Sequence, residues 1–443
     1  MTLYLLSKQL PRSNIYPSIM NLKRVVVTGL GAVTPLGNNV PDFWNNVVQG
    51  VSGAGPITNF DTNTIITKTK FACEVKDFDV AQYIDRKESR KLDKYAHFSV
   101  ASAVQAINDA AIDTSKEDPD RVGVVLGVGM GGIDSFEEGI DTISVQKREG
   151  QELKVTPFFI PRIIGNMAAG YISIIYGFSG PNYITSSACA SSTNALIDAV
   201  NLIRLGKADI MISGGSEAAV TDCGICGFSV MHALSSRNES PETASRPLSA
   251  SRDGFVLGEG GGCVVLEELE HAKARGAKIY AEVAGWGLSS DAFHMTAPEP
   301  EGKGAAKVML NALNDAEMEP EQIDYINMHG TSTPLGDVVE CKAIQSVFGE
   351  HAYKMNISAT KSMTGHLLGG AGAIEAIISI LSVHNDIVPP TINHEEGDND
   401  EQIDYHMNFT FNKAQKRIVN SALSNTFGFG GHNACIIFKK YSD

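Results

Sequence analysis

The chain has 443 residues, of which 43% are hydrophobic, and this is enough apolar surface for a large buried core. Its formal net charge of −15 excludes non-specific nucleic-acid binding, because such binding needs a basic surface that neutralises phosphates. Seven scattered cysteines are untypical of a disulfide-rich secreted domain, and no apolar run reaches the roughly 20 residues that cross a bilayer, so we expect a globular, cytoplasmic protein outside the membrane.

The first 21 residues precede the first strong strand pattern and include a second methionine, Met20. We expect the fold to begin near residue 22. The residues before it are then a disordered or docked extension, or the product of an upstream start codon.

Apolar runs of strand length alternate with helical patterns along the rest of the chain. The runs begin at residues 24, 121, 183, 208, 262, 278, 324 and 356, and the helical patterns cover 194–205, 305–313, 335–347 and 370–383. This alternation predicts an α/β protein whose parallel sheets are covered by helices. The second series repeats the order of the first, and a charged stretch near residues 270–278 separates them. We therefore predict an N-terminal half over residues 22–275 and a C-terminal half over residues 276–443.

Cys189 stands in the segment SSACASST, where a strand pattern ends and a helix of small residues begins. The free N–H groups and partial positive charge of a helix N-terminus stabilise a thiolate and lower its pKa. The position therefore favours a reactive cysteine. The alternative is a buried structural cysteine, which is the commoner fate of this residue type.

Two histidines follow later strands. His329 opens HGTSTPLGD directly after the strand pattern DYINM, while His366 lies five residues after Lys361 in KSMTGHLLGGAGAIE. The carboxyl ends of parallel strands form the edge at which ligands bind. One cysteine and two histidines at such ends are the ingredients of nucleophilic and acid–base catalysis, although each histidine alone could be a helix cap or a surface residue.

Two further segments are less specific. The segment NTFGFGGHN, which contains Phe429, indicates either close backbone contact with a ligand or a tight turn between the last two strands. Cys223 and Cys226 form a C-x-x-C pair, but no second pair or suitably spaced histidine completes a metal site. We expect no metal there and interpret both cysteines as small apolar residues in a buried segment.

The segments around Cys189, His329, His366 and Phe429, in this order and spacing, resemble the β-ketoacyl-acyl-carrier-protein synthases, which are thiolase-like condensing enzymes. The likeness runs from about Lys23 to the C-terminus. The segments GHLLGGAGA, RPLSASRDGFVLGEGGG and SSDAFHMT look most like the long-chain elongating, type II members.

The resemblance implies an α/β thiolase fold of two similar halves in five layers, α-β-α-β-α, and a homodimer. It also implies an acyltransferase of fatty acid elongation. Such an enzyme condenses a cysteine-bound acyl chain with malonyl-acyl-carrier protein, giving 3-oxoacyl-acyl-carrier protein and carbon dioxide without a cofactor or metal. The carrier protein, bearing acyl or malonyl groups, is the expected partner.

The resemblance also implies a role for each site residue. Cys189 is the acyl-accepting nucleophile, His329 and His366 contact the malonyl thioester, and Lys361 gives structural and electrostatic support. Glu375 helps to order the site, and the N–H groups of Cys189 and Phe429 form an oxyanion hole. Phe429 also gates the pocket, and Met130 lines its acyl end. The pantetheine arm of the carrier contacts Thr296, Thr331 and Thr333.

Lys87, Arg90, Lys91 and Lys94 are spaced to share one face of a predicted helix. This face is either an ordinary solvated surface or a docking patch for the acidic carrier protein, which charge would steer to the enzyme. We predict docking at Lys87, Arg90 and Lys91.

Three other functions remain as alternatives. A degradative thiolase shares the fold but uses a second cysteine where this chain has His366. A non-catalytic chain-length partner should lack the nucleophile. A polyketide ketosynthase is the nearest enzymatic rival.

Overall fold

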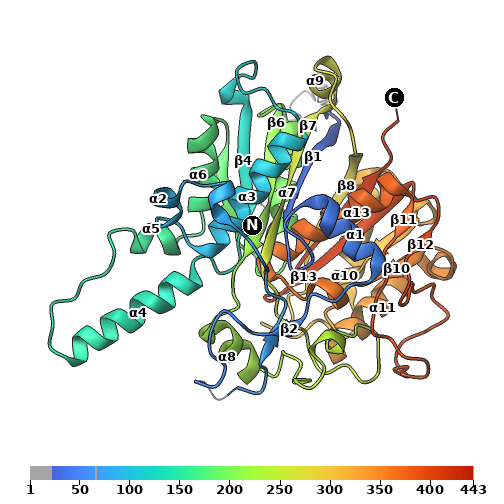
Figure 1. The fold of residues 1–443 in the computed structure, drawn as a ribbon. Coiled ribbons are helices and arrows are strands. Elements are labelled where there is room, and N and C mark those ends of the chain that lie inside the picture. Colours follow the sequence, from blue (N-terminus) through green and yellow to red (C-terminus); the bar gives the residue numbers. More distant parts are fainter. Residues whose placement is uncertain (1–21, 65–66, 443) are drawn as a thin grey trace, which may run out of the picture.

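The computed structural model describes residues 22–64 and 67–442, so the predicted N-terminal extension over residues 1–21 lies outside the described residues. Ten strands form one continuous sheet in the order β10-β9-β13-β14-β8-β1-β7-β6-β4-β5 (Figure 1). Their bounds are β1 Val25–Val33, β4 Val122–Gly127, β5 Asn182–Thr185, β6 Ile210–Glu217, β7 Gly260–Glu268, β8 Ala281–Ser290, β9 Tyr325–Asn327, β10 Asn356–Ser358, β13 Ser421–Gly428 and β14 His432–Lys439.

The sheet consists of two halves with the same internal topology. The order β5-β4-β6-β7-β1 in the first half matches β10-β9-β13-β14-β8 in the second, strand for strand in chain order. The two halves meet where β1 pairs antiparallel with β8 over two residues of each strand. The repeated order that the sequence indicated is therefore present in the fold. The predicted domain boundary after residue 275 falls between α9 (Leu269–Ala274) and β8, and it stays a prediction.

The expectation of purely parallel sheets is wrong, because each half is mixed. In the second half β10, β9 and β13 run parallel, whereas β14 is antiparallel to both β13 and β8. The first half has the same pattern, with β7 antiparallel to β6 and β1. Only three residues join β13 to β14, and a connection that short can link only antiparallel strands.

Helices separate and cover the two halves in three layers. The outer layers are α3 (Lys94–Asp109) with α6 (Met167–Tyr176) on the first half, and α10 (Lys303–Ala316) with α11 (Pro334–Phe348) on the second. Between the halves lie α7 (Ser191–Arg204) and α13 (Ala371–Asn385), and their side chains pack into one apolar core with strands of both halves. The predicted five-layered thiolase fold is confirmed.

Close backbone contact explains why β1 is rich in glycine. A Cβ atom on Gly31 would lie 2.0 Å from the carbonyl oxygen of Ser102 in α3, and one on Gly29 would lie 2.1 Å from that of Ala106. Only glycine lets the outer helix approach the strand this closely.

The smaller elements connect these layers. The helices are α1 Val40–Gln49, α2 Arg86–Ser89, α4 Ile133–Arg148, α5 Phe159–Ile163, α8 Asp222–Val230 and α12 Lys361–Thr364, and the short strands are β2 Gly55–Pro56, β3 Phe71–Ala72, β11 Ile387–Val388 and β12 Gln415–Lys416. Short 3₁₀ helices cover Val80–Gln82, Pro119–Arg121, Pro241–Thr243, Pro320–Gln322, Gly349–Tyr353 and Leu368–Gly370. Figure 1 shows α4 projecting away from the body of the molecule.

Among the described residues, one helical stretch is long and apolar enough to span a membrane, namely Leu368–Asn385, which contains α13. Within the protein 89% of that stretch consists of buried residues, and it forms part of the central helical layer. Its composition is therefore that of a core helix.

The single basic helix face expected over residues 87–94 is wrong. The short helix α2 ends at Ser89, and α3 starts at Lys94 because the carboxylate of Asp93 accepts the N–H of Tyr95 and caps the new helix. The ammonium group of Lys94 turns inward to Glu259, with 2.8 Å between nitrogen and oxygen. Lys87 and Arg90 remain exposed.

The expectation that Cys223 and Cys226 are buried is also wrong. Both lie exposed on α8, one helical turn apart. Alternation of apolar and small residues in this segment does not reveal that α8 lies at the surface.

Candidate active site

Cys189 lies in a tight turn between β5 and α7. Its neighbour Ala188 has a φ of +50°, a conformation that non-glycine residues rarely adopt. The hydroxyl of Ser191 holds this turn, because it accepts the N–H of Ser187 and donates to the carbonyl of Ala188. The turn places Cys189 directly before the N-terminus of α7, as the sequence predicted.

His366 lies beside the sulfur. Its Nε2 atom is 3.0 Å from Sγ of Cys189, although the two residues are 177 positions apart in the chain. The backbone N–H of His366 donates to the carbonyl of Val256, and the ring of Phe255 packs edge-on against the imidazole at 5.2 Å. Nδ1 of His366 is buried and has no hydrogen-bond partner among the described residues. Since an unpaired N–H costs more than an unpaired ring nitrogen, we assign the proton to Nε2.

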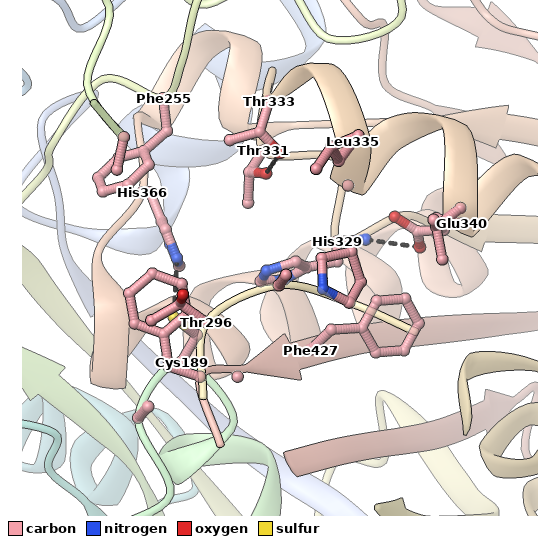
Figure 2. A pocket seen from close by; sticks show the side chains of 18 of the residues that line it. Cys189, Phe255, Thr296, His329, Thr331, Thr333, Leu335, Glu340, His366 and Phe427 are labelled. Atoms are coloured by element: carbon pink, nitrogen blue, oxygen red, sulfur yellow. Dashed lines mark hydrogen bonds between the residues drawn. The ribbon is translucent and has the colours of Figure 1, made fainter. Parts of the chain in front are cut away.

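His329 completes the group at the end of β9. Its ring lies 5.4 Å from that of His366 at an angle of 85°, so the two imidazoles converge on the same space (Figure 2). Glu340 fixes the histidine loop, because its carboxylate accepts the N–H groups of His329 and Gly330 at 2.9 and 2.8 Å. The side-chain amide of Asn425 donates to the same carboxylate.

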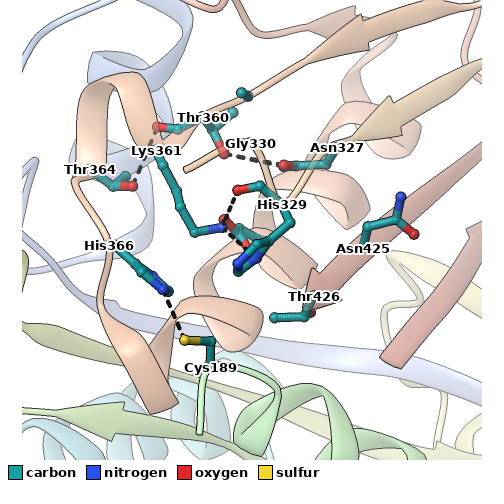
Figure 3. A network of polar contacts seen from close by, with 12 residues as sticks. Cys189, Asn327, His329, Gly330, Thr360, Lys361, Thr364, His366, Asn425 and Thr426 are labelled. Carbon is teal, nitrogen blue, oxygen red and sulfur yellow. Dashed lines mark hydrogen bonds and ion pairs between the residues drawn. The ribbon is translucent and has the colours of Figure 1, made fainter. Parts of the chain in front are cut away.

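Lys361 connects the histidines to the core. Its ammonium group donates to the carbonyl oxygen of His329 at 2.8 Å and points at Nδ1 of the same residue at 3.3 Å (Figure 3). It also pairs with the carboxylate of Glu375 on α13. A cation at Nδ1 makes that nitrogen the acceptor, so the proton of His329 resides on Nε2, which is the other ring nitrogen.

Both histidines are neutral at physiological pH. Burial lowers the pKa of His329 and of His366 well below the usual range, and the charge of Lys361 lowers both further. A neutral imidazole with its proton on Nε2 is a hydrogen-bond donor of the kind that stabilises developing negative charge.

The expected lowering of the cysteine pKa is wrong. Burial raises the pKa of the Cys189 thiol to about 11, and this outweighs the lowering by the charge of Lys361 and by the N–H of Phe429. The side chain packs in an apolar cluster, and the loss of water there disfavours the thiolate more than the helix N-terminus favours it.

A cavity of about 730 Å³ opens over these residues. Met130, Phe228, Thr296, Thr331 and Thr333 all line it, and Phe228 also packs against the apolar cluster that contains Cys189. The hydroxyls of Thr331 and Thr333 are 3.0 Å apart (Figure 2). The cavity wall therefore combines apolar side chains with hydroxyl groups, and the predicted substrate-lining residues all contribute to it.

Phe429 lies in the turn between β13 and β14, with a 36% exposed side chain at the cavity. Its backbone N–H points at the sulfur of Cys189. This approach requires Gly428, because a Cβ atom there would lie 2.7 Å from the carbonyl oxygen of Ser187. The segment therefore forms the tight turn between the last two strands, and its backbone contacts Cys189, whereas its contact with a ligand stays a prediction.

Comparison with known proteins agrees with this arrangement. The family models for the N-terminal and C-terminal domains of β-ketoacyl synthases match residues 22–272 and 280–395. The chain belongs to the β-ketoacyl synthase family. Among curated relatives, the 3-oxoacyl-[acyl-carrier-protein] synthase 2 of Synechocystis is 48% identical, covering 95% of this chain and 98% of the relative, and that of Coxiella burnetii is 47% identical over 96% and 100%.

Solved ketosynthases have the same fold. A β-ketoacyl synthase from Burkholderia phymatum superimposes with a TM-score of 0.86 at 34% identity, covering 95% of this chain and all of the other. A type II polyketide ketosynthase, solved in complex with its acyl-carrier protein, superimposes with a TM-score of 0.85 at 33% identity over the same shares. The higher identity to the fatty acid enzymes decides against the polyketide alternative. The predicted family, fold and activity are confirmed: this synthase is a condensing acyltransferase of fatty acid elongation.

Sequence reasoning missed several residues of this synthase site. Glu340 and Asn425 hold the His329 loop, Phe255 and Phe427 pack against the imidazoles, and Glu217 accepts backbone N–H groups at the cavity wall. Most of these contacts involve backbone atoms or ring faces, which leave no spacing pattern in the sequence. Phe255, Asn425 and Phe427 do lie in segments that carry the family resemblance, but nothing in those segments indicated their roles.

Proposed function

We propose that Cys189, His329, His366 and Lys361 carry out the condensation, with acyl and malonyl groups delivered by an acyl-carrier protein. The contact of 3.0 Å between Cys189 Sγ and His366 Nε2, with His329 beside it, is the observation that carries this proposal. It joins the nucleophile to two neutral N–H donors within one cavity.

In the first half-reaction, the sulfur of Cys189 attacks the thioester carbonyl of an acyl-carrier. The N–H groups of Cys189 and Phe429 stabilise the oxyanion, as preorganised donors do in other acyl transfers. The bond from sulfur to the acyl carbon forms while the carrier's thioester bond breaks. One thiol replaces another, so the proton that leaves Cys189 ends on the carrier's thiol, while the Nε2–H group of His366 lies 3.0 Å from the sulfur as a donor.

In the second half-reaction, malonyl-carrier loses carbon dioxide. The electron pair of the broken carbon–carbon bond passes into an enolate, and the Nε2–H groups of His329 and His366 donate to its thioester oxygen. The enolate carbon then attacks the acyl carbonyl on Cys189, and the bond from sulfur to the acyl carbon breaks. The 3-oxoacyl-carrier is released, and the Cys189 thiolate takes up a proton from solvent. Lys361, paired with Glu375, keeps the His329 proton on the nitrogen that faces the substrate.

The mixed lining of the cavity suits the two parts of the substrate. The apolar part near Met130 and Phe228 accepts the acyl chain, whereas Thr296, Thr331 and Thr333 bind the amide-rich pantetheine arm. Phe429 stands at the cavity as the gate. The carrier protein docks at Lys87, Arg90 and Lys91, of which Lys91 is paired with Glu88.

The protein acts as a homodimer. The edge strand β5 has no partner on its outer side among the described residues, and apolar side chains of neighbouring helices are exposed beside it. Ile174 on α6 is 73% exposed, and Phe136 on the projecting helix α4 is 49% exposed (Figure 1). Free strand edges and large exposed apolar side chains mark a surface for a second copy. We place this dimer in the cytoplasm, in keeping with the free cysteines among the described residues.

One assay tests the proposal. Purified protein, an acyl-carrier and malonyl-carrier should together yield carbon dioxide and one 3-oxoacyl-carrier per carbon dioxide. A Cys189→Ala variant that elongates at the wild-type rate would show that the nucleophile lies elsewhere.

A further inference from the structure

Glu217 is a fully buried carboxylate at the wall of the cavity, at the end of β6. Its oxygens accept the backbone N–H groups of Gly129 at 2.9 Å, Met130 at 3.1 Å and Gly131 at 3.2 Å. A fourth N–H, from Gly369, donates to it at 3.2 Å. None of the half-reactions above uses this group.

The four donors come from two segments that face each other. Gly129–Gly131 follow β4, and Gly369 belongs to the short helix Leu368–Gly370, which begins two residues after His366. Oε2 of Glu217 accepts from Gly129 and from Gly369, so one oxygen joins the two segments. The carboxylate therefore bridges the loop after β4 and the turn after His366.

The packing around this bridging carboxylate leaves no space for a further side-chain atom. A Cβ atom on Gly129 would lie 2.5 Å from Oε2 of Glu217, and one on Gly369 would lie 2.4 Å from the N atom of Gly129. Leu368, the residue directly before Gly369, has a φ of +47°, which non-glycine residues rarely adopt. The segment is thus held in a conformation that its own sequence disfavours.

The bridging carboxylate lies beside the part of the cavity that the proposed function assigns to the acyl chain. Met130 and Leu368, one from each joined segment, line the cavity, and Leu368 packs in the same apolar cluster as Cys189. A short acyl group stays close to the sulfur, whereas a long one must extend along the apolar wall. The position of that wall therefore matters more as the chain grows.

We propose that Glu217 is a specificity-determining positioning residue, whose carboxylate ties the Gly129–Gly131 loop to the turn after His366 and so fixes the acyl end of the cavity for long chains. This inference rests on the proposed function. A neutral amide cannot replace the carboxylate, because its NH₂ group would face N–H donors and could not accept from them.

The test compares Glu217→Gln with the wild type, using hexanoyl-carrier and tetradecanoyl-carrier as separate acyl donors and malonyl-carrier as extender. The ratio of kcat/KM for the long to the short donor should fall at least tenfold in the variant, with most of the loss in the long-chain reaction. A ratio that is unchanged or higher would overturn the inference. If the wild type elongates neither donor, the proposed function fails instead.

Two further variants separate positioning from a loss of folding. Gly129→Ala keeps the carboxylate but displaces the loop, so it should lower the same ratio. Glu267→Gln changes another fully buried carboxylate, on the neighbouring strand β7 near the end opposite Glu217, and should leave the ratio unchanged. An equal fall in the ratio for Glu267→Gln, with matching thermal unfolding curves, would assign the effect to general destabilisation and overturn the inference.

Discussion

The side chains of Lys361 and Glu375 form an ion pair whose members are only 2% and 1% exposed. Removing Lys361 leaves the buried carboxyl of Glu375 without a counter-charge, which costs about 3 to 5 kcal/mol where that carboxyl is ionised. We therefore expect Lys361→Ala to lower the free energy of unfolding by about that amount in urea denaturation at alkaline pH, and by less at pH 5, where the carboxyl takes up a proton. The double variant Lys361→Ala, Glu375→Gln should recover most of the loss. No recovery in the double variant would show that the pair is not the cause.

The same carboxyl predicts a pH dependence. Burial raises the pKa of Glu375 from its ordinary value to about 7, despite the opposing charge of Lys361. Because the folded pKa lies above the unfolded one, its contribution to stability is greatest at low pH and declines as the pH rises towards 7. In Lys361→Ala the opposing charge is gone, so unfolding free energy should fall by up to about 1.4 kcal/mol per pH unit between pH 5 and 8. A flat profile in this variant would contradict the raised pKa.

Labelling of Cys189 reports its raised pKa directly. Since burial moves the pKa of this thiol to about 11, the rate of its alkylation by iodoacetamide should rise steadily with pH and show no plateau near neutrality. Peptide mass spectrometry separates Cys189 from the exposed pair Cys223 and Cys226. A plateau below pH 8 would mean that the helix N-terminus lowers the pKa of this thiol by more than burial raises it.

Reversal of charge tests the docking patch. Arg90→Glu with Lys91→Glu should raise the KM for carrier-bound substrates roughly fivefold, corresponding to about 1 kcal/mol for partly exposed charges, and spare small thioesters. The effect should shrink at high salt. The control Lys207→Glu with Lys342→Glu makes the same change in net charge at other exposed positions and should not raise KM. Equal losses on carrier-bound and small substrates would count against docking.

The fold was largely predictable from sequence, and the site only in part. Eight apolar runs and the two strands that flank the glycine-rich segment correspond to the ten strands of the large sheet. Motifs located Cys189, His329, His366 and Lys361, because these residues follow segments that the topology brings to one place. Strand direction was wrong for β7 and β14, since periodicity does not distinguish parallel from antiparallel neighbours. The pKa of Cys189 was wrong because desolvation depends on the apolar cluster around it, to which Phe255 and Leu368 come from distant parts of the chain.

The split of the basic segment has a similar cause. The spacing of Lys87, Arg90 and Lys91 fits one helix, but Asp93 caps a new helix and interrupts it. Both outcomes were compatible with the local sequence. Tertiary contacts of Lys94 with Glu259 favour the interrupted form.

The central claim is that acyl transfer and decarboxylation use different groups of one site. It is tested most directly by measuring acyl-enzyme formation by mass spectrometry and carbon dioxide release from malonyl-carrier in Cys189→Gln, His329→Ala and His366→Ala. In each histidine variant the rate of carbon dioxide release should fall, because about 3 kcal/mol of transition-state stabilisation is lost. The rate of acyl-enzyme formation should fall less. The Cys189→Gln variant should form no acyl-enzyme and should still release carbon dioxide. Wild-type carbon dioxide release in both histidine variants would contradict the account.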